Sequence, residues 1–427
     1  SMQMNIEWKI LMNNFKIPKI RFMNFNDKWN YKTLDEISNS IEYGINAPAK
    51  DFDGNHKYLR ITDIDDASRL FITEKLSSPD INFTAGDYEN YKLQKNDLLF
   101  ARTGASVGKT YLYRKTDGKV YYAGFLIRAR LHDSYDGNFV FQQTLTDKYK
   151  RFIEITSQRS GQPGVNGKEY GEWKIGMTSY DEQTSIGSLF RTLDDLLASY
   201  KDNLTNYQSL KATMLSKIFP KTGETVPEIR LDGFEGEWEV QTLKELASFS
   251  KGNGYTKNDL VNSGKEIILY GRLYTNYQTI ISKVNTFVTS VKVNTVISKG
   301  GEVIVPASGE TAEDISRASV VEKSGIILGG DLNIIYPDEN KVDSIFLALT
   351  ISNGSQQKEL IKRAQGKSVV HLRNNDLEKV VLHYPSMEEQ QAIGAYFSNL
   401  DNLINSYREK ISQLETLKKK LLQDMFI

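Results

Sequence analysis

EQTSIGSLFRTLDDLLASYKDNL (residues 182–204) and EQQAIGAYFSNLDNLINSYREKI (residues 389–411) are two versions of one sequence. Glu-Gln, Ile-Gly, Phe, Leu-Asp, Leu and Ser-Tyr match without a gap, at a constant offset of 207 residues from 182 to 389. A second pair, PKIRFMNFNDKWNYKTLDEI (18–37) and PEIRLDGFEGEWEVQTLKEL (227–246), repeats Pro, Ile-Arg, Phe, Trp and Thr-Leu in register. The chain therefore contains one kind of unit twice, and this repeat decides the fold.

The two matching stretches have the apolar spacing of a coiled coil. Apolar residues recur at alternating steps of three and four, which is the coiled-coil signature. Each run covers roughly 30 residues, or about 45 Å at the helical rise. We predict that the two helices pack on one another antiparallel, the alternative being two amphipathic helices in unrelated cores. The predicted seam consists of Phe190, Leu193, Leu197, Tyr200, Leu204, Tyr207, Met214 and Ile218 in the first helix, and of Phe397, Leu400, Ile404, Tyr407, Ile411, Leu414, Leu421 and Met425 in the second.

Polar residues mark the start and the interruptions of each predicted helix. Ser179-x-x-Glu182 and Ser386-x-x-Glu389 have the spacing of capping boxes. Lys211 and Lys418 interrupt the seams. Asp194 and Asp195 are predicted to be ordinary helix-surface charge.

The repeat predicts an α+β chain with an internal pseudo-two-fold symmetry. Two mixed α/β domains are separated by two long antiparallel coiled-coil helices. The predicted ranges are an N-terminal extension at 1–17, a first domain at 18–180, a central helix at 181–220, a second domain at 221–385 and a C-terminal helix at 386–427. Between the repeated anchors the domains diverge: Arg102-Thr103-Gly104 lies opposite Ala307-Ser308-Gly309, and the second domain adds Glu310, Glu313 and Asp314.

Composition limits the class of protein. The chain has 427 residues, no cysteine and four histidines without metal-ligand spacing, so we expect no disulfide and no metal site. No apolar run is long enough to span a bilayer, and we predict a cytoplasmic protein. The 54 basic and 54 acidic side chains cancel, whereas a protein that binds nucleic acid unaided usually carries a basic excess. Neutrality indicates no such ligand, cations confined to one face, or a partner that supplies the positive field.

The stretch ARTGASVGKT (residues 101–110) invites comparison with a nucleotide-binding P-loop. A P-loop requires glycine five positions before Gly108, where this chain has Thr103, and a helix after it. Here a strand-like segment, Tyr111-Leu112-Tyr113, follows instead. The spacing therefore argues against a nucleotide site.

The chain resembles the specificity (S) subunit of type I restriction–modification systems. The resemblance covers nearly the whole chain and rests on the order domain, long helix, domain, long helix; on Glu-Gln-x-x-Ile-Gly at the start of both helices; and on NDLLFARTGASVGK (96–109), LRITDI (59–64) and SGQPGVNG (160–167). It implies that each domain is a target recognition domain that binds half of a split DNA sequence. It also implies that the helices set the spacing and dock two modification (methyltransferase) subunits.

The resemblance also implies where the chemistry lies. The partner subunits would bring S-adenosylmethionine to methylate adenine, and restriction/translocase subunits would add ATP and magnesium. This chain shows neither a methyltransferase nor a nuclease motif, so we predict a non-catalytic subunit that binds double-stranded DNA and no cofactor of its own. A two-headed coiled-coil scaffold for proteins without a DNA role and a nucleotide-using enzyme built around 101–110 stay open as alternatives.

Candidate DNA contacts follow from residue type. Cations and backbone N–H groups of a glycine-rich loop suit phosphates, whereas polar and aromatic side chains suit base edges. The phosphate candidates are Arg102, Thr103, Ser106 and Lys109. The other candidates are Tyr43, Asn46, Lys50, Arg60, Asp63, Gln158, Arg159, Gln162, Asn166 and Lys168 in the first domain, and Lys251, Asn253, Tyr255, Lys257, Tyr270, Arg272, Tyr274, Lys362, Arg363, Gln365 and Lys367 in the second. Arg128 and Arg130 share one strand face, which is either a phosphate-facing strip or a solvated sheet face.

Overall fold

The computed structural model describes residues 17–159, 161–366 and 369–427, which form two compact units. The first unit contains the chain up to Asp202 and Glu409–Ile427, and the second contains Asn203–Arg408. The two long helices, α5 (Tyr180–Lys217) and α12 (Met387–Asp424), start and end within a few residues of the predicted helices. Each helix is divided between the units, whereas the predicted domain ranges assigned each helix as a segment of its own.

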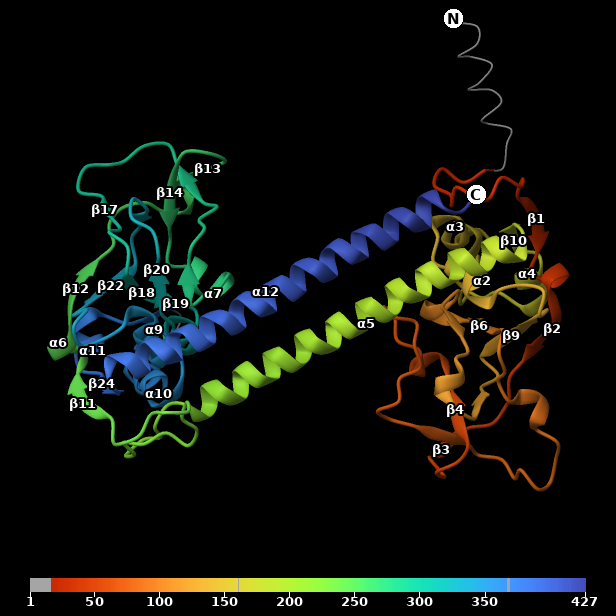
Figure 1. Cartoon of the computed structure of the whole chain (residues 1–427), viewed down its shortest axis with the longest axis horizontal. Coiled ribbons are helices and arrows are strands. Elements are labelled where there is room, and N and C mark those ends of the chain that lie inside the picture. The colour runs from red at the N-terminus through yellow and green to blue at the C-terminus, as the bar shows by residue number, and fades with distance from the viewer. Residues whose placement is uncertain (1–16, 160, 367–368) are drawn as a thin grey trace, which may run out of the picture. The chain divides into compact units, whose positions relative to one another are not determined.

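The first unit is built on a four-stranded antiparallel sheet with the order β2-β9-β6-β7 (Figure 1). Its strands are β2 (Ser38–Tyr43), β6 (Asp97–Ala101), β7 (Thr110–Leu112) and β9 (Leu126–Leu131). Two-stranded pairs surround this sheet: β1 (Asn30–Thr33) with β10 (Lys174–Met177), β3 (Ala49–Asp51) with β5 (Ser77–Pro79), and β4 (Lys57–Leu59) with β8 (Val120–Tyr122). The short helices are α2 (Gly137–Gln143), α3 (Asp147–Thr156) and α4 (Gly167–Gly171).

The second unit repeats this plan with a larger set of strands. One five-stranded sheet contains β12 (Ala247–Lys251), β22 (Leu332–Pro337), β18 (Glu302–Pro306), β20 (Ser319–Val321) and β15 (Ile280–Ile281) in that order. A second contains β13 (Leu260–Val261), β16 (Phe287–Val288), β14 (Lys265–Ile268), β21 (Ile327–Leu328) and β17 (Val296–Ile297). β11 (Glu239–Thr242) pairs with β24 (Val381–Tyr384), and β19 (Ser308–Gly309) with β23 (Val370–His371). Its short helices are α6 (Leu243–Leu246), α7 (Arg272–Thr275), α8 (Ala312–Ile315), α9 (Ser344–Ser352), α10 (Gly354–Arg363) and α11 (Asn374–Leu377).

Within each unit α5 and α12 run side by side and antiparallel (Figure 1). In the first unit Lys418 Nζ of α12 lies 2.5 Å from Asp194 Oδ1 of α5. In the second unit Lys211 Nζ of α5 lies 2.5 Å from Asp401 Oδ1 of α12, so the same pair occurs with the helices exchanged. Residues in the N-terminal half of one helix therefore face residues in the C-terminal half of the other. This confirms the predicted antiparallel packing and excludes helices buried in unrelated cores.

The lysines that interrupt the seam thus have acidic partners on the facing helix. Asp194 was predicted to be ordinary surface charge, but its side chain is only 35% exposed and it pairs with Lys418. Every predicted seam residue is buried or half-buried, while its neighbours on the outer face are exposed. An aliphatic stem with a paired ammonium group can occupy a seam position without leaving a buried charge unpaired.

A buried Arg–Glu pair fastens each helix to its own domain. Arg21 Nε and Nη2 donate to the Glu182 carboxylate at 2.6 and 2.7 Å, and Arg230 does the same to Glu389 at 2.8 and 2.6 Å. Both carboxylates are almost fully buried. The second predicted capping box is half present, because Ser386 Oγ accepts from the Glu389 backbone N–H at 3.4 Å. Both glutamate carboxylates, however, accept from an arginine of their own repeat. In each repeat, the Ile-Arg motif supplies the arginine and the Glu-Gln motif supplies the glutamate of one bidentate ion pair.

The glutamine that follows each glutamate makes a second repeated contact. The side-chain oxygen of Gln183 accepts from the Asp136 backbone N–H at 3.1 Å, and Gln390 accepts from the Asp343 N–H at 2.9 Å. Asp136 and Asp343 in turn accept from the first turns of α2 and α9. Each long helix is thereby joined to the N-terminus of a short helix in its domain.

The hydrophobic cores use matching residues from both repeats. In the first unit Phe426, just after α12, packs against Phe139 and Phe190 at ring-centroid distances of 5.5 and 5.7 Å. In the second unit Phe219, just after α5, packs against Phe346 at 6.0 Å. The aromatic residue after the C-terminus of each long helix therefore packs into the hydrophobic core of the domain formed by the other repeat. None of the helices in the described part of the chain is both long and apolar enough to cross a membrane.

We predict that Arg21→Met destabilises the first unit by about 3–5 kcal/mol, because it leaves the Glu182 carboxylate buried without its cation. Arg21→Met combined with Glu182→Gln should recover much of that loss, since no buried charge remains. Hydrogen exchange resolved by segment measures the effect: amides of β1, β10 and the start of α5 should exchange faster in the single variant. Arg230→Met is the matched control and should accelerate exchange around β11 and β24 instead. Equal effects of both variants on both units would contradict the assignment.

Candidate nucleic-acid interface

The glycine-rich loop connects two antiparallel strands. β6 ends at Ala101, a 3-10 turn covers Gly104–Ser106, and β7 begins at Thr110. Gly108 has φ +83°, a left-handed conformation that lets the loop close the hairpin. A strand follows the loop, as predicted, and not the helix that a P-loop places against phosphates.

Lys109 has an internal role and not the predicted phosphate contact. Its side chain is 8% exposed, its Nζ lies 2.5 Å from Asp66 Oδ1, and it donates to the Ile64 carbonyl at 3.1 Å. The lysine thus fastens the loop to the segment after β4. The pairing with Asp66 lowers the pKa of that carboxyl group.

Three loops of the first domain meet beside the glycine-rich loop. The Arg102 backbone N–H donates to the Phe125 carbonyl at 3.1 Å, and the Val165 N–H donates to the Arg102 carbonyl at 2.9 Å. The Gly167 N–H donates to the Tyr43 hydroxyl at 3.0 Å. The ends of β2 and β6, the turn before β9 and the 161–167 loop therefore form one surface.

Arg102 lies near two aromatic side chains on this surface. Its guanidinium carbon is 5.2 Å from the ring centroid of Tyr43 and 5.8 Å from that of Phe125. Tyr43 is 43% exposed and Phe125 is 62% exposed. Gln162 reaches the same place, because a Cβ added at Gly104 would lie 3.0 Å from its Nε2. The structure thus brings together Tyr43, Arg102, Thr103 and Gln162 of the candidates and adds Phe125, which the apolar run AGFLI made indistinguishable from a core residue.

The other candidates of the first domain are not part of this cluster. Arg60 makes a bidentate pair with Asp63, which is 8% exposed. Lys50 lies 3.6 Å from Asp80, and Arg159 pairs with Glu169. Asn166 caps α4 through the Glu169 N–H at 3.0 Å. The remaining candidates are Asn46, Gln158 and Lys168, which are exposed, and Ser106, which is half-buried.

Arg128 and Arg130 belong to the interior. Arg128 is fully buried and pairs with Glu42, and Arg130 Nε lies 2.8 Å from Asp97 Oδ1. Neither interpretation of their alternation was right, because a buried carboxylate on β6 and an acidic residue on β2 neutralise this strand face. Two strongly basic positions are thereby used for packing and not for a ligand.

The second domain presents different chemistry at the equivalent place. The Ala307 N–H donates to the Asp331 carbonyl at 2.8 Å, which matches the Arg102–Phe125 backbone contact. An arginine and an exposed aromatic residue are thus replaced by Ala307 and Asp331. Nearby, burial and the neighbours Tyr270, Glu310 and Asp314 raise the pKa of Tyr274. The second domain therefore offers an acidic, tyrosine-containing surface where the first offers a cation.

The second domain's remaining candidates are mostly held by internal contacts. Tyr255 is 6% exposed and its hydroxyl accepts from the Lys292 N–H at 2.7 Å. Arg272 donates to Asn285, Gln278 and the Lys283 carbonyl, and burial lowers its pKa. Asn253 donates to the Asn294 carbonyl, and Arg363 pairs with Glu359. The exposed candidates are Lys251, Lys257, Lys362 and Gln365, with Tyr270 half-buried, and Lys367 lies outside the described residues.

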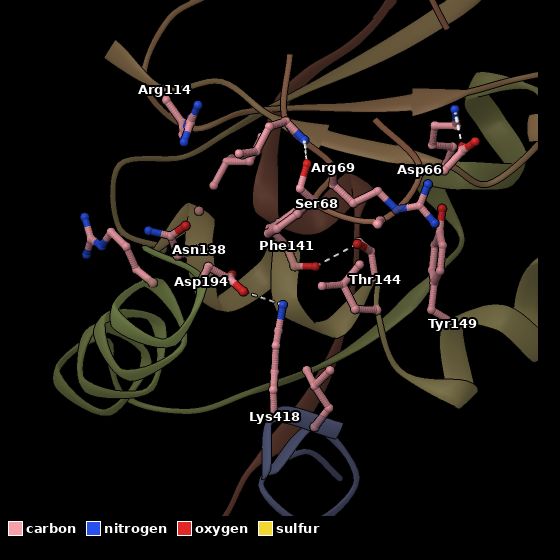
Figure 2. A pocket seen from close by; sticks show the side chains of 18 of the residues that line it. Asp66, Ser68, Arg69, Arg114, Asn138, Phe141, Thr144, Tyr149, Asp194 and Lys418 are labelled. Carbon is pink, nitrogen blue, oxygen red and sulfur yellow. Dashed lines mark hydrogen bonds and ion pairs between the residues drawn. The ribbon is translucent and has the colours of Figure 1, made fainter. Parts of the chain in front are cut away.

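A cavity of about 1220 Å³ opens in the first unit between the domain and the helix pair (Figure 2). Ten basic and six acidic side chains line it. Figure 2 shows the Lys418–Asp194 pair at its edge and Arg69, Arg114 and Tyr149 along its walls. A wall of this composition suits an anionic ligand such as a phosphate backbone. Among the described residues, no three His, Cys, Asp or Glu side chains gather as a metal site.

Comparison with known proteins identifies the family. The model of the type I restriction modification DNA specificity domain matches residues 26–206 and again residues 235–416. The chain is similar to the type I restriction enzyme MjaVIII specificity subunit of Methanocaldococcus jannaschii, with 21% identity over 342 residues that cover 77% of this chain and 78% of the relative. It is also similar to the putative type I restriction enzyme MjaX specificity subunit of the same organism, with 22% identity over 424 residues, 96% of this chain and 95% of the relative.

The fold has a counterpart among solved structures. The S subunit of the type I restriction–modification system from M. genitalium superposes with a TM-score of 0.63 at 16% identity, over 96% of this chain and 99% of that chain. This likeness extends over both units and both long helices, and each repeat found in the sequence corresponds to one match of the family model. The chain belongs to the family of type I restriction modification DNA specificity domains, of which it carries two copies.

Proposed function

We propose that this chain recognises a two-part DNA target, with one part read by each domain. The family makes it a sequence-specific DNA-recognition component of a type I restriction–modification complex, and a recognition component rather than a catalytic one. A protein scaffold without a DNA role does not fit that family. The observation that supports two separate readings is the contrast between Arg102 with Phe125 in one domain and Ala307 with Asp331 at the same backbone position of the other.

The two long helices are proposed to set the distance between the two parts. Each helix is continuous for 38 residues and contributes to both compact units. The Lys418–Asp194 and Lys211–Asp401 pairs fix one antiparallel register, because a shift of either helix would separate both lysines from their partners. A fixed register gives the helix pair a fixed length. A helix pair of fixed length suits a DNA target whose two parts are separated by a constant gap.

The outer face of the helices is proposed to dock two modification subunits. Leu210 and Leu417 are 42% and 45% exposed and occupy matching positions of the repeat, 207 residues apart. Leu196, two heptads before Leu210, is 40% exposed on the same helix. Apolar residues at heptad spacing outside an already complete seam are typical of a surface that packs further helices.

The chemistry is proposed to come from the partners. The modification subunits would bind S-adenosylmethionine and methylate adenine within the target, and restriction subunits would bring ATP and magnesium. This chain would bind no cofactor of its own and would act in the cytoplasm, where its DNA and those cofactors occur. The zero net charge agrees with a complex in which partners supply much of the electrostatic attraction to DNA.

We expect the chain assembled with its modification subunits to methylate one asymmetric motif of two parts around an unspecified gap. Sequencing of methylated products from a randomised DNA library measures this motif. Exchange of residues 221–385 for the corresponding segment of another family member should change one part and leave the other part unchanged. A single continuous motif, or a change in both parts, would contradict the division of labour.

We expect one added heptad in each helix to lengthen the gap. Insertion after Asp202 and after Arg408 leaves the Lys–Asp pair of each unit in place and adds about 10.5 Å, or about three base pairs. The same library selection reads the gap. Insertion in α5 alone is the control and should prevent assembly, since it shifts one helix against the other. An unchanged gap with both insertions present would show that the helices do not set it.

Leu210→Glu together with Leu417→Glu should weaken binding of the modification subunits at least tenfold, because two carboxylates replace apolar contacts. Titration with labelled modification subunit measures the affinity. Gln208→Glu with Gln413→Glu is the matched control, since it places the same two carboxylates at exposed polar positions of the same helices. Equal affinities of both double variants would remove this face as the docking surface.

A further inference from the structure

The Arg102 side chain is held by contacts with two aromatic rings, and its described contacts use one of its guanidinium donors. We propose that Tyr43, Arg102 and Phe125 form a pre-organised reading group in which Arg102 recognises a guanine base edge and Phe125 packs against a neighbouring base. This inference rests on the proposed function, namely that the first domain reads part of the DNA target. The residue-type argument from sequence assigned Arg102 to phosphate instead.

The position of Arg102 is restricted by backbone hydrogen bonds and by two aromatic rings. Its backbone N–H and carbonyl are bound by Phe125 and Val165, and its guanidinium lies over the rings of Tyr43 and Phe125. Tyr43 is itself fixed, because its hydroxyl accepts from the first N–H of α4. Cation–π contacts with two rings limit the rotamers that a free arginine would sample. A ligand therefore meets a guanidinium that is already oriented.

Arg102 also keeps its donors for an external partner. A guanidinium carries five N–H groups, and the described contacts use one, from Nη1 to the Gly124 carbonyl at 3.5 Å. Among the described residues no carboxylate lies within ion-pair distance of Arg102, whereas Arg60, Arg128 and Arg130 each have one. An oriented, unpaired guanidinium is the group that makes two parallel hydrogen bonds to guanine O6 and N7. A phosphate can also accept two hydrogen bonds from an arginine, and a base contact differs from it in its dependence on the DNA sequence.

Phe125 projects from a turn whose backbone packs closely against the neighbouring loop. Gly124, before it, lies so close to the preceding loop that an added Cβ would be 3.3 Å from the Ile45 carbonyl oxygen. On the other side, a Cβ added at Gly44 would overlap the Ala123 carbonyl. An aromatic side chain that is 62% exposed on a rigid turn, next to an oriented arginine, suits contact with a base or insertion at a base step. At this position the second domain has Asp331 in place of the aromatic residue.

The test uses the full complex with modification subunits and compares Arg102→Lys, Arg102→Ala and Phe125→Leu with the unaltered chain. Randomised-library methylation gives the motif, and binding titrations at several salt concentrations give the number of phosphates neutralised. We expect the preference for G·C over other base pairs at one position of the motif to fall about 5- to 150-fold in both arginine variants. The other part of the motif should be unchanged. Arg102→Lys should lower this preference nearly as much as Arg102→Ala, although it keeps the charge. Phe125→Leu should weaken the same part of the motif while assembly is retained.

Three outcomes would overturn the proposal. Retained specificity in Arg102→Lys, with a uniform loss of affinity in Arg102→Ala and a salt slope smaller by about one, would make Arg102 a phosphate contact. An unchanged motif in all variants would remove the cluster from the DNA interface. Loss of modification-subunit binding on size-exclusion chromatography would make it a protein contact. If the unaltered complex yields no two-part motif, the proposed function fails first, so the two failures are distinguishable.

Discussion

A buried ion pair between an arginine and a glutamate fastens each long helix to the domain that precedes it. The Arg21–Glu182 and Arg230–Glu389 pairs are bidentate, with carboxylates almost completely removed from water and arginines that are mostly buried. Such a pair tolerates little movement, because separation of the charges at low dielectric would leave both uncompensated. The orientation of each helix at its start follows from this contact and from the adjacent glutamine bridge. The antiparallel register then depends on the two Lys–Asp pairs within the seam.

Internal pairing of charges also explains why an electrically neutral chain can belong to a DNA-recognition family. Many of its cations are committed to internal partners: Lys109 to Asp66, Arg128 to Glu42, Arg130 to Asp97 and Arg363 to Glu359. These pairs shape loops and sheets and contribute little field outside the protein. What distinguishes the surface is local arrangement, above all the contacts of Arg102 with two aromatic rings in the first domain. The count of charged residues therefore says less about the ligand than their pairing does.

Sequence analysis was most successful where the signal was local and repeated. Heptad spacing over two long segments indicated both helices, and the constant offset indicated their equivalent roles. The candidate DNA contacts were harder to predict, because residue type does not reveal a partner that is distant in the chain. Lys109 was expected at the surface, yet its partner Asp66 lies 43 positions earlier. Phe125 was not among the candidates because the continuous apolar run AGFLI is typical of a buried strand, whereas the turn exposes its side chain.

The sequence by itself determined the duplication, the two helices with their seam and the family resemblance. Each follows from periodicity or from residue-by-residue matching, which needs no knowledge of long-range contacts. Only the tertiary structure decided which charged groups neutralise one another and which remain available. It also decided that Tyr43, Arg102 and Phe125, from three separate loops, form one group. The physical reason is that strand pairing and loop closure bring these residues together, and the pairing is a property of the folded chain, not of any one segment.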